Sequence, residues 1–288
     1  MTDKPFNISH TKLATFRRCL QQYHWKYVDK YYPPSSIGQA RGIAGHAALA
    51  EWHTTYDTDK SMQAAWDNWE LAGYTQDEEW QLLEDALNRY YIFSAEKDTF
   101  KIITAEKKFV LPLHTLVSSG TSSEHLESVG IPSDIEFIGY IDGIVKDQET
   151  FWLLENKFYK RMDNSDLSMD SQVSLYLLAA SIMDFKVNGV IYNIIRVADT
   201  KIAASEPVIR RKVYRNPAGL QHIKQEIIRQ TQVMHKYHQE GGVPYRNPTK
   251  DCSWDCPFYQ PCLSMTDDGQ EPTQILQSIT QVRRTDDD

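Results

Sequence analysis

The sequence predicts a mixed α/β fold in which helices flank a central mixed β-sheet. Apolar residues recur at spacings of three and four over residues 9–27, which indicates an amphipathic helix. Two runs rich in aromatic and branched residues, 135–145 and 150–157, are separated only by a short turn, as in paired strands. A chain of 288 residues with 41% hydrophobic residues can bury a large core. We expect one domain over residues 1–265 and a disordered acidic tail over residues 266–288.

The N-terminal half is predicted to be mainly helical. Ser9 is placed as the N-cap of the first helix, and Pro33-Pro34 breaks the chain after it. Further helices are expected over residues 39–56 and 61–98, a strand over 104–113, and a connecting loop over 114–133. Gly42 and Gly45 inside the second helix suggest a close approach to other backbone.

The C-terminal half supplies the remaining strands and two more helices. Helices are predicted over residues 169–183 and 217–237, and strands over 187–197 and 207–214. The run 135–145 would return antiparallel against the run 150–157, which brings Asp142 one strand over from Glu155.

Charged residues end the otherwise apolar run at Phe151-Trp152-Leu153-Leu154. Because residues two apart project from the same face of a strand, Glu155 and Lys157 would stand side by side. Two carboxylates with a lysine beside them can hold a hard divalent cation and face a phosphate. The plainer interpretation is a structural Glu–Lys ion pair and an aspartate that caps a turn.

Three motifs in order resemble the PD-(D/E)xK nuclease superfamily. Asp142, followed after twelve residues by Glu155-Asn156-Lys157, resembles its catalytic core. Gln172 and Tyr176 resemble the QxxxY motif of the RecB-like branch, and Gly42-Ile43-Ala44-Gly45-His46 resembles its histidine motif. The resemblance implies a restriction-endonuclease-like core. It also places Glu106 where some relatives keep a further acidic residue.

The resemblance further implies metal-dependent hydrolysis of phosphodiester bonds. Mg²⁺ or Mn²⁺ would be held by His46, Asp142, Glu155 and the backbone carbonyl of Asn156, and would activate a water molecule. Lys157 would orient that water or stabilise the transition state, and Gln172 and Tyr176 would position the substrate strand. By resemblance the substrate is single-stranded DNA, degraded from an end.

The four cysteines predict a second metal centre. Cys19 stands alone, whereas Cys252, Cys256 and Cys262 lie within eleven residues. In an intracellular protein, four such thiols favour zinc or an iron–sulfur cluster over two disulfides. One cysteine before the core and three after it resembles the RecB-like nucleases that carry a [4Fe-4S] cluster, among them CRISPR-associated adaptation nucleases and helicase-linked nuclease domains. The sequence departs from that pattern in having Leu20 instead of proline, and three residues between Cys252 and Cys256.

Composition and short motifs narrow the functional classes to which the protein can belong. A net charge of −8 disfavours a protein that grips duplex DNA by bulk electrostatics. Neither a signal peptide nor a long apolar segment is evident, so we expect a cytoplasmic protein with no membrane partner. No GxxxxGK[ST] motif is present, so any unwinding would need a helicase or recombination partner. The competing function is a non-catalytic module that binds nucleic acid or a partner; a redox enzyme is a weaker third possibility. The tail is read as solvated, with a partner-binding peptide as the alternative.

Overall fold

The structure is a computed structural model that describes residues 6–117, 135–160, 167–266 and 271–280. The chain divides into two compact units. The first comprises residues 1–7 and 36–228, and the second comprises residues 8–35 and 229–288. The second unit is therefore built from two stretches that are far apart in the sequence. A single domain over residues 1–265 stays a prediction, which one cooperative unfolding transition would support.

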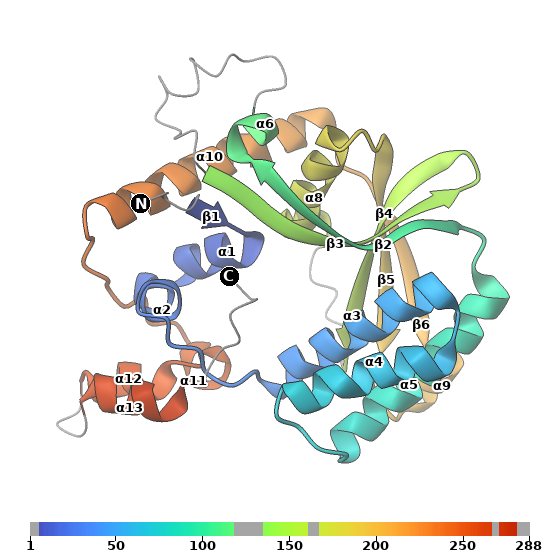
Figure 1. Cartoon of the computed structure of the whole chain (residues 1–288), viewed down its shortest axis with the longest axis horizontal. Helices are drawn as coiled ribbons and strands as arrows, with labels where there is room; N and C mark the ends of the chain where they lie inside the picture. The colour runs from blue at the N-terminus through green and yellow to red at the C-terminus, as the bar shows by residue number, and fades with distance from the viewer. Residues whose placement is uncertain (1–5, 118–134, 161–166, 267–270, 281–288) are drawn as a thin grey trace. The chain divides into compact units, whose positions relative to one another are not determined.

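A mixed β-sheet organises the described part of the first unit (Figure 1). Its strands are β1 (Phe6–Ile8), β2 (Lys101–Pro112), β3 (Ile135–Asp147), β4 (Thr150–Tyr159), β5 (Val187–Arg196) and β6 (Val208–Val213). The strand order is β1-β3-β4-β5-β6, and β2 also pairs with β3. Strand β4 runs parallel to β5, whereas the pairs β2–β3, β3–β4 and β5–β6 are antiparallel. The predicted fold class, a mixed sheet flanked by helices, is confirmed.

Helices cover both faces of this sheet. One layer consists of α3 (Ile37–Thr55), α4 (Thr58–Leu71) and α5 (Glu78–Lys97), which share a buried core with Ile195 of β5. On the other face, the N-cap of α8 (Ser171–Ile182) accepts a hydrogen bond from Tyr192 of β5. Shorter elements of this unit are α6 (Leu113–Val117), a 3₁₀ turn (Leu167–Met169) and α9 (Lys201–Ser205).

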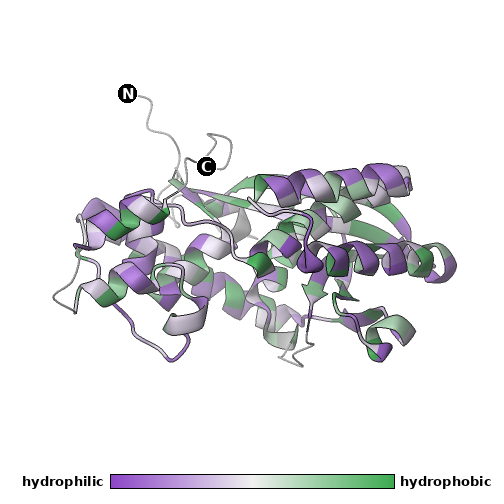
Figure 2. Cartoon of the chain, turned by 90° about the horizontal axis from the view of Figure 1, so that it is seen from below, coloured by the Kyte–Doolittle hydropathy of each residue, from purple (hydrophilic) through white to green (hydrophobic). Residues whose placement is uncertain are grey.

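Side-chain caps explain where several helices begin. Ser36 forms a capping box with Gln39 at the start of α3. Asp57, Asp77 and Asp170 accept hydrogen bonds from the first turns of α4, α5 and α8. Hydrophilic and hydrophobic residues interleave along the helices, as expected for amphipathic helices (Figure 2). No helix in the described ranges is long and apolar enough to cross a membrane.

The first predicted helix is interrupted at Cys19, which corrects the expectation of one helix over residues 9–27. Ser9 caps α1 (His10–Arg18), but Cys19 adopts an extended conformation with φ −160°. The chain then continues as α2 (Leu20–Tyr23) and a π-helix (His24–Val28). The break leaves backbone groups without helical partners, and Asn247 donates to the carbonyl of Arg18 at 2.8 Å.

Two further expectations need correction. The helical stretch 61–98 is two helices, because Gly73 has φ +88° and Asp77 restarts the helix. The expectation of a disordered tail fails for α13 (Pro272–Ile279), whose Leu276 is buried with Trp25 and Phe258. Most of the expected loop over residues 114–133 and the end of the tail lie outside the described residues.

The second unit contains the other C-terminal helices. Helix α10 (Pro217–Gln239) spans the boundary between the units, which falls after residue 228. It is followed by α11 (Cys252–Asp255) and α12 (Tyr259–Ser264), which carry the clustered cysteines.

Candidate functional site

Strands β3 and β4 bring Asp142, Glu155 and Lys157 together. The antiparallel pair Gly143↔Leu154 places Asp142 next to Glu155. One oxygen of Asp142, Oδ2, accepts a hydrogen bond from the backbone nitrogen of Asn156 at 2.7 Å. The Lys157 Nζ donates to Glu155 Oε1 at 2.6 Å, as expected for residues two apart on one face. The two carboxylates and the ammonium therefore share one end of the sheet.

Helix α3 delivers His46 to the same end of the sheet. The His46 Nδ1 lies 3.2 Å from Asp142 Oδ1. The approach is close because residue 45 is glycine: a Cβ there would lie 2.4 Å from the ring of Phe158 on β4. That same ring lies 5.8 Å from the His46 imidazole. The glycine-histidine sequence thus sets how near α3 lies to the two strands.

Glu106 on β2 joins this group. The pairs Ala105↔Gly143 and Lys107↔Ile141 flank it, so Glu106 lies opposite Asp142. Its φ of +46° is in the left-handed region, which costs a non-glycine residue roughly 1–2 kcal/mol. Partial desolvation and the Asp142 charge raise the pKa of Glu106, whereas His46 lowers it. The Glu106 carboxylate, carried by this strained backbone, thus interacts electrostatically with Asp142 and His46.

Helix α8 presents Gln172 and Tyr176 one turn apart. The Gln172 Nε2 donates to the Tyr176 hydroxyl at 3.2 Å. The Tyr176 ring packs against Phe109 at 5.7 Å, and burial together with the Glu155 charge raises the pKa of Tyr176 to about 12. The phenol is therefore a neutral hydrogen-bonding group near neutral pH, beside the carboxylates.

A comparison with protein-family models identifies the superfamily of this chain. The family model of the PD-(D/E)XK nuclease superfamily matches residues 7–262, a range that includes every residue described above. This chain belongs to the PD-(D/E)XK nuclease superfamily. No curated protein matches the sequence. Members of this superfamily hydrolyse phosphodiester bonds, so the chain is a nuclease by family.

Burial and like charges shape the electrostatics of this nuclease site. Burial and the neighbouring Asp142 raise the pKa of Glu155 to about 7, against the opposing effect of Lys157. Burial acts to lower the pKa of Lys157, but the Glu155 carboxylate raises it above its usual range. Burial likewise opposes the protonated form of His46, yet Asp142 raises its pKa to about 9. Each carboxylate thus has a cationic partner.

The donor atoms of the nuclease site fit a hard divalent cation. Carboxylate oxygens and a backbone carbonyl are the ligands that Mg²⁺ and Mn²⁺ prefer, and a histidine nitrogen is compatible with Mn²⁺. Within the described ranges, no group of three or more His, Cys, Asp or Glu side chains converges tightly enough to hold a metal ion. Glu155 is turned toward Lys157, and Asp142 toward His46 and the Asn156 nitrogen. The chemistry of the donors therefore fits, although they do not form a closed ligand sphere.

A buried polar ladder lies on the other face of β4 and was not predicted from the sequence. Asn156 stands between the two catalytic candidates Glu155 and Lys157, and its Oδ1 accepts a hydrogen bond from Asn193 Nδ2 at 2.8 Å. Arg210 Nε donates to Asn193 Oδ1 at 3.2 Å, and Arg210 pairs with Asp98. The two asparagines are 2% and 0% exposed. The signal in the sequence was an asparagine in each of the runs that form β4 and β5, which the register aligns with Arg210 in the basic stretch of β6.

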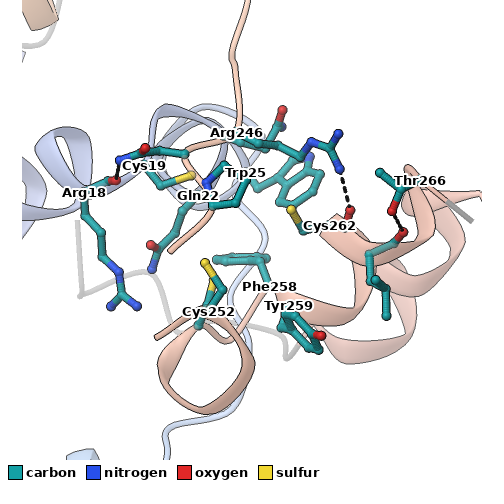
Figure 3. Close-up of a pocket in the computed structure, with 15 residues that line it drawn as sticks. Arg18, Cys19, Gln22, Trp25, Arg246, Cys252, Phe258, Tyr259, Cys262 and Thr266 are labelled. Carbon is teal, nitrogen blue, oxygen red and sulfur yellow. Dashed lines mark hydrogen bonds between the residues drawn. The ribbon is translucent and has the colours of Figure 1, made fainter. Parts of the chain in front are cut away.

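The second unit holds a pocket lined by all four cysteines. The pocket has a volume of about 160 Å³, and Trp25 and Phe258 form its apolar walls. Figure 3 shows Cys19, Cys252 and Cys262 around this space. All four cysteines are free thiols, and burial raises the pKa of Cys256 and Cys262. All four cysteines thus line one cavity, although within the described ranges no three of them converge closely enough to hold a metal ion; that they bind a cluster stays a prediction.

Proposed function

We propose that this nuclease hydrolyses single-stranded DNA from an end, with Mg²⁺ or Mn²⁺ as its metal. The observation that carries the proposal is the convergence of Asp142, Glu155, Lys157 and His46, from β3, β4 and α3, in a chain of the PD-(D/E)XK superfamily. Preference for a single strand and for ends comes from the resemblance to RecB-like nucleases.

Each residue has a role in the proposed reaction. Asp142, Glu155, His46 and the backbone carbonyl of Asn156 would hold the cation, with Glu106 opposite Asp142 as an additional oxygen donor. When bound, the cation supplies Lewis-acid activation of water and neutralises phosphate charge. Lys157, held by Glu155 at 2.6 Å, offers its ammonium to the phosphate oxygens as negative charge develops on them. Gln172 and Tyr176 orient the DNA strand.

The second unit carries a structural [4Fe-4S] cluster in this proposal. Its support is that four free thiols line one cavity. Thiolates are the ligands of such clusters, and four of them leave no open position on iron for redox catalysis with a substrate. Free thiols also fit a reducing cytoplasm. A helicase or recombination protein would supply any unwinding.

Cleavage of end-labelled DNA tests the nuclease. Protein purified without oxygen should degrade single-stranded DNA with Mg²⁺ or Mn²⁺, and the product ladder would distinguish exonuclease from endonuclease. Glu155→Ala and Lys157→Ala should lose more than about 100-fold in rate, because they remove a metal ligand and a charge-stabilising group. Glu149→Ala is the matched control, since the Glu149 side chain is 93% exposed on the turn between β3 and β4. A folded wild type that cuts no DNA would favour the non-catalytic binding module instead.

Iron and sulfide analysis tests the cluster. Wild-type protein should be brown and contain four irons per chain, as expected for one [4Fe-4S] cluster. Cys256→Ala should be colourless and less stable, because cluster binding contributes to folding. Stoichiometric zinc in place of iron would contradict the assignment, as would a colourless wild type.

A further inference from the structure

An exposed aromatic residue lies on β3 close to the candidate nuclease site. Tyr140 is 49% exposed, although it belongs to a strand whose neighbouring residues Gly139 and Ile141 are buried. The Nζ of Lys108, its partner on β2, lies 5.6 Å from the centre of the Tyr140 ring. The next outward residue on β2, Val110, is 44% exposed. An aromatic ring, a cation and an apolar surface therefore line one face of the hairpin.

This exposed face lies on β2 and β3, the strands that also carry Glu106 and Asp142 of the candidate nuclease site. Tyr140 precedes Asp142 by two residues, and Lys108 follows Glu106 by two residues. A strand rises about 3.4 Å per residue, so each step corresponds to roughly 7 Å, a length that one nucleotide can span. Residues two apart on a strand share a face. The Tyr140 ring thus stands about one nucleotide step from Asp142 on the same face of β3.

The fold does not need the Tyr140 side chain for its core. The hairpin is packed from its opposite face, where Phe109 and Phe137 are buried and their rings lie 5.5 Å apart. Gly139 is required there, because a Cβ at that position would lie 2.4 Å from Phe109. A single exposed tyrosine is ordinary on a protein surface. Its place beside a lysine and two residues from Asp142 is what calls for an explanation.

We propose that Tyr140, Lys108 and Val110 form a platform for one unpaired nucleotide of the substrate strand, next to the phosphate that is cleaved. The proposal rests on the proposed nuclease function. The base stacks on the Tyr140 ring and extends over Val110, and the Lys108 ammonium contacts the adjacent phosphate. A base inside a duplex has both faces covered by its neighbours and cannot stack on a side chain. The platform therefore selects single-stranded over duplex DNA.

Binding in an inactive background tests the platform. A fluorescein-labelled single-stranded oligothymidylate would be titrated by anisotropy into the full-length protein carrying Glu155→Gln, with a blunt duplex in parallel. Adding Tyr140→Ala should weaken single-strand binding by roughly five- to 150-fold. Tyr140→Phe keeps the stacking ring and should bind like the parent. Tyr214→Ala is the matched control, since Tyr214 is 60% exposed and follows β6, which pairs near the start of β5.

The dependence of affinity on salt, and the comparison of single-stranded with duplex DNA, separate base stacking from general electrostatic attraction to DNA. Lys108→Gln should reduce the slope of log affinity against log salt by about 0.7, the value for one phosphate contact on a single strand. Duplex affinity should be unchanged by Tyr140→Ala. Equal single-strand affinities of Tyr140→Ala and its parent would overturn the proposal, and so would an equal loss on single strands and duplex.

Cleavage separates failure of the platform from failure of the nuclease assignment. If the wild type cleaves single strands and Tyr140→Ala does so with the same KM, the platform is wrong and the nuclease function stands. If the parent binds single strands through Tyr140 but the wild type cleaves no DNA, Tyr140 is a single-strand binding residue and the nuclease function is wrong.

Discussion

Replacing Gly45 by alanine tests how α3 places His46. The added Cβ would lie 2.4 Å from the Phe158 ring, closer than real Cβ contacts, so the ring or the helix must move. Overpacking of this kind costs roughly 1–3 kcal/mol. Alanine in place of glycine inside a helix contributes about 1 kcal/mol in the opposite direction. We therefore expect Gly45→Ala to lower the free energy of unfolding by up to about 2 kcal/mol.

The same helix supplies a matched control. Gly42 also lies in α3, and a Cβ at Gly42 would meet nothing within 4 Å. Gly42→Ala should therefore stabilise the protein by about 1 kcal/mol through helix propensity alone. Because the Phe158 ring lies beside the His46 imidazole, Gly45→Ala should also slow cleavage, by up to about 100-fold if His46 moves by 1 Å. Gly42→Ala should leave the rate unchanged.

A double-mutant cycle identifies the clash. With Phe158→Ala in place the ring is absent, so Gly45→Ala should become stabilising by about 1 kcal/mol, as at Gly42. Urea unfolding of the four proteins, followed by circular dichroism, measures these changes. If Gly45→Ala destabilises the protein equally with and without the Phe158 ring, the close approach of α3 to β4 is not the reason for glycine at this position.

Three further predictions concern buried groups. Burial lowers the pKa of His53 to about 4, so near pH 6.5 the unfolded chain begins to bind a proton that the folded chain does not bind. The free energy of unfolding should therefore fall by roughly 3 kcal/mol from pH 6.5 to pH 4. Urea unfolding at several pH values should show a weaker pH dependence for His53→Gln. Asn193→Leu removes the hydrogen bonds of Asn156 Oδ1 and Arg210 Nε, although Arg210 keeps its ion pair with Asp98. This change should cost roughly 3 kcal/mol by urea unfolding and slow cleavage. An unchanged stability would refute the ladder. Leu276→Ala should cost roughly 2–4 kcal/mol, whereas no loss would show that α13 is not packed.

Local patterns were enough to predict strands β2 to β6 and the residue pairs within one strand or helix at the site, but strand β1 (Phe6–Ile8) was not predicted. The apolar runs around residues 135–145 and 150–157 became β3 and β4 with the expected antiparallel pairing. Spacing alone placed Glu155 beside Lys157 and Gln172 beside Tyr176, because each pair depends only on strand or helix periodicity. Their catalytic roles stay predictions. The family comparison confirms the superfamily that the motifs resemble.

Features that depend on distant residues could not be predicted. The break at Cys19 lies within a regular helical pattern, and its freed backbone groups are satisfied by residues near 247, far along the chain. The ladder from Asn156 to Arg210 requires the register of three strands, which no single strand encodes. The helix over Pro272–Ile279 lies in a polar tail, and only its burial against Trp25 and Phe258 reveals why it forms.

The second unit is made of residues 8–35 and residues from 229 onward, and this has a consequence for synthesis on the ribosome. Residues 36–228 emerge between these two stretches and belong to the first unit. At 5–20 residues per second, roughly 12–47 seconds pass before the segment around Cys19 meets Cys252 and the cysteines that follow. During that interval the N-terminal thiol has none of its pocket partners. Loading of an iron–sulfur cluster would therefore be a late, post-translational step, and a chain truncated before residue 252 would be unable to retain one.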